Sequence, residues 1–268
     1  MPPSTIQSHV GFIVLVDISG YTRFIMDHKR FGIKALEQRN KRVTQEHAEA
    51  IISILLEAVI DHLDTILVVN KLEGDAALFY ALCDDPAHLA PQLIERLRQA
   101  FNVFNNELER LKACDGCLCQ ACCERGDLRI KIIAHAGEFM IKPVSRFEEL
   151  AGEAVIFAHR LLKNNIPSSE YLALTPAMSR LLSETDQFEL HQQKVDDFGS
   201  VKLRVFYPQK PQVKPRKLPL PWPWQTWSMV RFFAQPRSRQ LLEASRRALN
   251  QGLSPELEPS TSEIVGNP

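Results

Sequence analysis

The feature that most constrains this chain of 268 residues is the short stretch KLEGD at residues 71–75, which stands between two apolar runs. The runs cover residues 63–69 and 76–80 and are rich in residues that favour strands. Two such runs joined by a short glycine-containing link predict a β-hairpin. A plain turn does not need a lysine and two carboxylates, so the tip of this hairpin is predicted to carry a functional site.

A second acidic stretch, DISGYT at residues 17–22, follows the apolar run 11–16. The strand is expected to end at Val16 and to lead into a turn at Asp17. Either Asp17 or Asp75 alone could serve as a turn-capping residue, because aspartate and glycine are common in turns. Since both follow apolar strands, we expect them to meet over a divalent cation, which needs oxygen ligands from several directions.

Composition restricts the classes of function. Hydrophobic residues make up 45% and charged residues 24%, so an ordinary globular core can form. The net charge of +0 gives no field that would attract nucleic acid, and no nucleic-acid partner is expected. The first ten residues lack the pattern of a signal peptide, and no apolar run of about 18 residues predicts a membrane span. Together with the clustered cysteines, this favours a reducing cytoplasm.

The order of predicted elements indicates an α+β domain over residues 8–208. Helical periodicity covers residues 31–62 and continues from Pro86 to Leu111, a third helix is expected near residues 150–164, and hairpins separate these helices. A turn is expected at residues 135–137, between two strands. A Pro-rich linker (209–221), an aromatic and basic helical tail (222–250) and a disordered tail (251–268) are expected to follow.

Four motifs, in this order, resemble those of the class III adenylate and guanylate cyclases. DISGYT resembles their first metal motif, and KLEGD looks like their second, which combines a base-reading lysine with a metal aspartate. LRIKI (128–132) followed by HAG (135–137), and the GxxVxxAxR pattern from Gly152 to Arg160, are similar to later parts of the domain. The resemblance covers about residues 10–207. It implies a ferredoxin-like (βαββαβ-type) cyclase domain, with an antiparallel-rich sheet and helices on one face.

The resemblance also implies a reaction and a site. Asp17, Asp75 and the backbone carbonyl of Ile18 would hold Mg²⁺ or Mn²⁺ at the interface of a head-to-tail homodimer. Lys71 and Glu149 of the partner would read the purine, which favours ATP over GTP, and Arg160 would stabilise charge at the α-phosphate. The product would be 3′,5′-cyclic AMP with pyrophosphate.

This chain departs from the family pattern at Ile156, where active members carry an asparagine that orients the ribose. Loss of one positioned polar group can cost about 10²–10³ in rate. Glu149 replaces the usual aspartate, and Glu73 adds a carboxylate beside the metal site. The alternative function is therefore a catalytically degraded regulatory module that binds nucleotide or metal. Lys71 could also be a solvated turn residue, and Arg160 could face Glu153 or Glu149 on the helix surface.

Five of the six cysteines crowd into residues 114–123. Cys114, Cys117, Cys119 and Cys122 have the two-residue spacing of Zn²⁺ knuckles, but the two pairs are separated by a single residue, which is shorter than in zinc ribbons. A structural Zn²⁺ site, idle reduced thiols and redox chemistry all remain open. A subgroup of cyclase-like proteins of unassigned function is similar in this Cys-rich segment (113–126).

The aromatic and basic stretch 222–250 has two readings. It could lie in a membrane interface, or its aromatic residues could fold back onto the domain or a protein partner.

Overall fold

The computed structural model describes residues 7–28, 34–113, 128–183 and 187–208. The elements in order are β1 (Gln7–Ser19), α1 (Tyr21–His28), α2 (Lys34–Leu63), β2 (Val68–Glu73), β3 (Ala76–Leu82), α3 (Pro86–Ala113), β4 (Arg129–Val144), β5 (Phe147–Ala151), α5 (Glu153–Leu161), β6 (Tyr171–Leu174), α6 (Pro176–Ser179), β7 (Glu189–Val195) and β8 (Gly199–Phe206). The Cys-rich segment, the linker and both predicted tails lie outside these ranges, apart from Ala113 at the end of α3, and stay predictions.

The strands form one mixed sheet in the order β2-β3-β1-β4-β6-β8-β7, with β5 paired to the far end of β4. The β4–β6 pair is parallel and the other pairs are antiparallel. The predicted α+β fold with an antiparallel-rich sheet is therefore confirmed.

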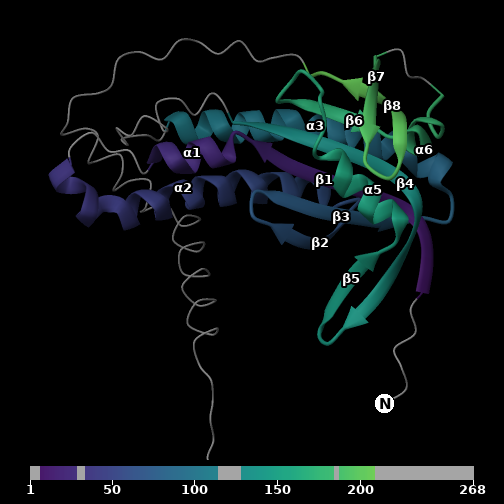
Figure 1. The fold of residues 1–268 in the computed structure, drawn as a ribbon, viewed down its shortest axis with the longest axis horizontal. Helices are drawn as coiled ribbons and strands as arrows, with labels where there is room; N and C mark the ends of the chain where they lie inside the picture. Colours follow the sequence, from purple (N-terminus) through teal and green to yellow (C-terminus); the bar gives the residue numbers. More distant parts are fainter. Residues whose placement is uncertain (1–6, 29–33, 114–127, 184–186, 209–268) are drawn as a thin grey trace, which may run out of the picture.

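Alternation along β1 shows how the layers are built. Phe12, Val14 and Val16 are fully buried against one face, in the core cluster that includes residues of the long helices α2 and α3. Ile13 and Leu15 point to the other face, where the short helix α5 packs. Figure 1 shows the two long helices running side by side along the sheet, with the β4–β5 arm extending away from the body.

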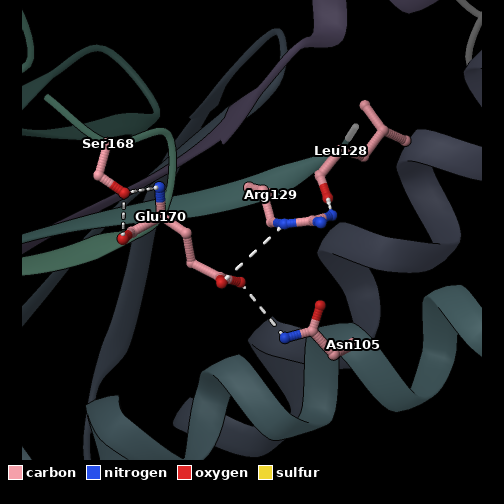
Figure 2. A network of polar contacts seen from close by, with 5 residues as sticks. All are labelled: Asn105, Leu128, Arg129, Ser168 and Glu170. Carbon is pink, nitrogen blue, oxygen red and sulfur yellow. Dashed lines mark hydrogen bonds and ion pairs between the residues drawn. The ribbon is translucent and has the colours of Figure 1, made fainter. Parts of the chain in front are cut away.

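A buried carboxylate ties α3 to the entry of β4 and β6 (Figure 2). Glu170 is 4% exposed and accepts a hydrogen bond from Asn105 Nδ2 at 3.3 Å. The guanidinium of Arg129 lies 4.0 Å from the other carboxylate oxygen and donates to the carbonyl of Leu128 at 2.7 Å. Since a buried charge is costly unless it is paired, this network fixes where the two neighbouring strands begin.

Several local expectations differ from the structure. β2 begins at Val68 and continues to Glu73, so Lys71 and Glu73 lie inside the strand rather than at the tip of the hairpin. β1 continues to Ser19, so Asp17 lies inside a strand rather than in the turn, which forms at Gly20 with φ 90°. β4 runs through residues 135–137 without the expected turn, because its ladder with β1 is unbroken from Arg129 to Ile141. β5 was not expected at all; its pairing with the end of β4 makes the arm.

Within the described ranges, no helix is long and apolar enough to cross a membrane.

Candidate functional site

The hairpin β2–β3 brings Asp75 to Asp17, as the sequence predicts. Asp17 lies opposite Ala76 in the β1–β3 ladder, and the amide of Ile18 donates to the carbonyl of Asp75 at 3.1 Å. Burial, together with the negative charge of Asp17, raises the pKa of Asp75 to about 6. A half-buried carboxylate beside a second negative charge is stabilised in its ionised form by a nearby cation.

The donor set fits Mg²⁺ or Mn²⁺. The amide and carbonyl of a strand residue point to the same side, so the carbonyl of Ile18 faces Asp75 as its amide does. Among the residues that the structure describes, no group of three or more His, Cys, Asp or Glu side chains gathers around one point. Asp17 and Asp75 are a pair of carboxylates, and Mg²⁺ is commonly held by one or two carboxylates with substrate phosphates completing the shell.

Two further charged residues at this site are not predicted by the motifs as site residues. Lys131 of β4 stands opposite Asp17, and its Nζ lies 2.9 Å from Asp17 Oδ2. Glu49 of α2 accepts a hydrogen bond from the Tyr21 hydroxyl at 3.2 Å, and its charge adds to the rise in the pKa of Asp75. The only sequence signal for Lys131 was its position as a lysine inside the apolar run LRIKI. The sequence of α2 gave no signal for Glu49.

The predicted base-reading pair is also brought together. Lys71 Nζ lies 3.1 Å from Glu73 Oε1 and 3.6 Å from Glu149 Oε2, so it joins β2 to β5. The hydrogen bond to Glu73, with the charges of Glu73 and Glu149, raises the pKa of Lys71. Glu73 thus partners Lys71 and also lies 3.8 Å from His159 Nδ1.

Arg160 lies in a cleft of about 510 Å³ between α5 and β7. The positively charged residues that line it are Lys71, Arg160, Lys163 and Lys194. Ile156 also lines the cleft and is 53% exposed, so an apolar side chain stands where a polar one was expected. Lys163 and Lys194 were not predicted as site residues.

Arg160 is held by the turn between β7 and β8. Its guanidinium nitrogens lie 3.6 Å from Asp196 Oδ2 and 3.3 Å from Asp197 Oδ2. The aspartates are 84% and 77% exposed, so each pair is worth roughly 0–1 kcal/mol and a ligand anion could displace it. The alternative partners of Arg160, Glu153 and Glu149, are not the ones that the structure shows; Asp196 and Asp197 of the turn pair with it instead.

One chain therefore carries two separate groups. Asp17 lies near the end of β1, and Asp75 lies in the turn between β2 and β3. Lys71 and Arg160 line the cleft, and the lining of the cleft includes neither Asp17 nor Asp75. The four cysteines predicted as Zn²⁺ ligands, Cys114, Cys117, Cys119 and Cys122, lie outside the described residues.

Comparisons with known proteins agree with this fold. The model of a protein family of unknown function (DUF2652) matches residues 52–171. An uncharacterized protein of Mycobacterium tuberculosis (Rv2561/Rv2562) is 40% identical over 131 residues, which are 49% of this chain and 60% of that protein. The match thus spans less than two thirds of that relative.

Solved structures of cyclase domains are similar despite low identity. The adenylyl cyclase CyaB from P. aeruginosa has a TM-score of 0.56 at 12% identity, over 79% of this chain and 100% of that chain. The guanylyl cyclase Cya2 has a TM-score of 0.54 at 9% identity, over 80% and 100%. A class III adenylyl cyclase-like ATP-binding protein from Pseudomonas aeruginosa has a TM-score of 0.50 at 17% identity, over 68% and 36%. The chain therefore has the fold of a class III nucleotide cyclase domain.

Proposed function

We propose that this protein is a metal-dependent nucleotidyl cyclase that converts ATP to 3′,5′-cyclic AMP and pyrophosphate at a homodimer interface. The observation that carries the proposal is the convergence of Asp17 and Asp75, which are 58 residues apart in sequence, beside the carbonyl of Ile18. Mg²⁺ or Mn²⁺ held there would lower the pKa of the ribose 3′-hydroxyl and neutralise the triphosphate.

The chain's own residues would orient the nucleotide. Lys71 and Glu149 present a donor beside an acceptor, which suits the adenine edge better than that of guanine in the family that the motifs resemble. Arg160, released from Asp196 and Asp197, would place a planar cation against the phosphates. Lys163 and Lys194 would add positive charge along the same wall.

The separation of the two groups on one chain supports the dimeric site. A head-to-tail homodimer would set the acidic pair of one protomer against the basic cleft of its partner, which creates two equivalent sites. The same pairing would bring positive charge to the triphosphate from the side opposite the cation.

A second candidate function, a nucleotide-binding module without turnover, is favoured by one observation. Ile156 occupies an exposed position in the cleft where the ribose would lie, and it offers no hydrogen bond to a hydroxyl. Such a protein would bind nucleotide with metal but release it unchanged.

Product analysis separates the two functions. The full chain is incubated with Mn²⁺ and either ATP or GTP, and the products are resolved by chromatography. We expect cyclic AMP from wild type and none from Asp17→Ala or Asp75→Ala, with Asp64→Asn, an exposed carboxylate at the end of α2, as the control. Nucleotide-dependent thermal stabilisation without cyclic product would indicate the binding module.

A further inference from the structure

A gap in the sheet lies beyond the end of β6. This strand has four residues and pairs with β4 only at Lys131–Ala134, whereas β4 has 16 residues and β8 has eight. After Leu174 the chain turns into α6, and β5 joins β4 only from Met140 onward. Within the described ranges, residues 135–139 of β4 and 199–203 of β8 therefore have no strand on the sides that face each other.

Backbone directions show that β4 presents hydrogen-bonding groups to this gap. The amide of Thr175 donates to the carbonyl of Ala134 at 3.1 Å, so the backbone groups of Ala134 point away from β1. Because these directions alternate along a strand, the amides and carbonyls of Ala136 and Glu138 also face the gap. No backbone partner for them occurs in the described part of the chain.

The opposite edge of the gap, on β8, also presents backbone hydrogen-bonding groups. Since the amide of Thr175 points to β4, Leu174 points to β8, where it pairs with Arg204. By the same alternation, the backbone groups of Lys202 and Ser200 face the gap. Alongside β6, β4 and β8 each lie one strand spacing from it, so at the edge of the gap they are roughly 9.6 Å apart, the width that one added strand requires.

A cavity of about 950 Å³ occupies this position. Its lining includes the unbroken run 135–140 of β4 and residues 200–202 of β8, with the first residues of α6 and α5 as further walls. A ligand there meets two unpaired strand edges rather than a smooth surface, which is the setting in which peptides add as strands.

His135 contributes a buried donor to the cavity. It is 9% exposed, its Nδ1 lies 2.9 Å from the hydroxyl oxygen of Thr175, and that oxygen also accepts from the amide of Met178. Thr175 is fully buried, so its hydroxyl proton needs an acceptor, and Nδ1 is the one at hand. This assigns the proton of the neutral imidazole to Nε2. That atom stands 2.8 Å from the place where Gly137 would carry a Cβ, and Ala154 Cβ lies 3.2 Å from the same place, so the glycine allows His135 and α5 to pack closely on β4.

The two faces of the gap differ in chemistry. On the face of α5, the cavity is lined by Phe157 and Phe198, whose ring centroids lie 4.8 Å apart, and this wall suits a large apolar side chain. On the other face, Lys202 and Arg180 oppose the carboxylate of Glu138, so positive charge is in excess there; the second carboxylate of the cavity, Glu153, stands at the start of α5.

We propose that this gap is a docking site for an extended segment of a partner protein, which inserts as an additional strand between β4 and β8. A large apolar residue of the segment would lie against the rings of Phe157 and Phe198, and a neighbouring acidic residue, which points to the opposite face, would meet Arg180 and Lys202. The site is separate from Asp17 and Asp75 and does not depend on cyclase activity.

The test uses linear seven-residue peptides displayed on phage and selected against the full chain. We expect enrichment of sequences with a large apolar residue next to aspartate or glutamate. Synthetic copies should bind the wild type one to one by calorimetry, and their binding should protect the amides of Ala136 and Glu138 from hydrogen exchange.

Two variants and a control locate the binding. Ala136→Pro removes an amide that faces the gap and leaves the ladder with β1 intact, so it should weaken binding at least tenfold. Lys202→Glu, at an exposed position, should weaken the binding of acidic peptides. It should also keep the fold, so it provides the test if the proline variant does not fold. Arg146→Glu, at the exposed turn of the β4–β5 arm, should bind as wild type. Failure of any sequence to enrich, or equal binding by Lys202→Glu and wild type, would overturn the proposal.

Discussion

His135 is an example of a protonation state set by burial. Desolvation lowers its pKa to about 4, so the imidazole is neutral in the folded protein at neutral pH. In the unfolded chain its pKa is about 6.5. Between these values the unfolded state binds more protons than the folded state, and the free energy of unfolding must therefore fall as the pH falls from 7 toward 4.

We predict that His135 alone costs about 2 kcal/mol of unfolding free energy between pH 7 and pH 5. His135→Gln, which cannot be protonated, should lose that much less over the same interval. Urea denaturation at the two pH values measures the difference. Equal pH dependence in wild type and variant would show that the imidazole is charged or solvated in the folded state.

Ile156 is a residue whose replacement separates chemistry from folding. Because it is 53% exposed on α5, Ile156→Asn should change the unfolding free energy by no more than about 0.5 kcal/mol. If the missing hydrogen bond limits turnover, cyclic AMP formation from Mn²⁺-ATP should rise about 10²-fold. Unchanged turnover, with nucleotide binding retained, would indicate that the defect lies elsewhere.

At the scale of elements, the central position of β1 depends on a close approach. A Cβ added to Gly11 would lie 2.0 Å from the carbonyl oxygen of Ala81 in β3. That contact is with backbone and cannot be relieved by turning a side chain. Gly11→Ala should therefore separate β1 from β3 and destabilise the protein by several kcal/mol.

Gly74→Ala is the matched comparison for this prediction. Gly74 has φ 67° but open space around it, so alanine there costs only backbone strain, about 1–2 kcal/mol. The urea midpoint of Gly11→Ala should therefore be lower than that of Gly74→Ala. Comparable midpoints would contradict the tight β1–β3 contact.

Elements with a local signal could be predicted from sequence. The β2–β3 hairpin follows from two apolar runs around a glycine, and the start of α3 follows from Pro86. β5 could not be predicted, because its residues include Glu148 and Glu149 and its partners, β4 and Lys71 of β2, are distant in sequence. The pairs Lys131–Asp17 and Arg160–Asp197 depend on register and on a distant turn, which no local pattern encodes.

At the scale of the whole molecule, the proposed site requires two protomers. If Asp75 acts in one protomer and Arg160 in its partner, the variants Asp75→Ala and Arg160→Ala should each be inactive alone. Mixed and allowed to exchange, they should regain about a quarter of wild-type activity, because half of the dimers then contain one intact site of two. No recovery in a mixture shown to contain heterodimers would place all the groups within one chain.

The central claim is that Asp17 and Asp75 share one divalent cation, and diffraction from crystals grown with Mn²⁺ and a non-hydrolysable ATP analogue tests it most directly. We predict an anomalous manganese peak bridging the carboxylates of Asp17 and Asp75, next to the carbonyl of Ile18. Nucleotide bound without manganese at these carboxylates, or manganese located elsewhere in the chain, would contradict it.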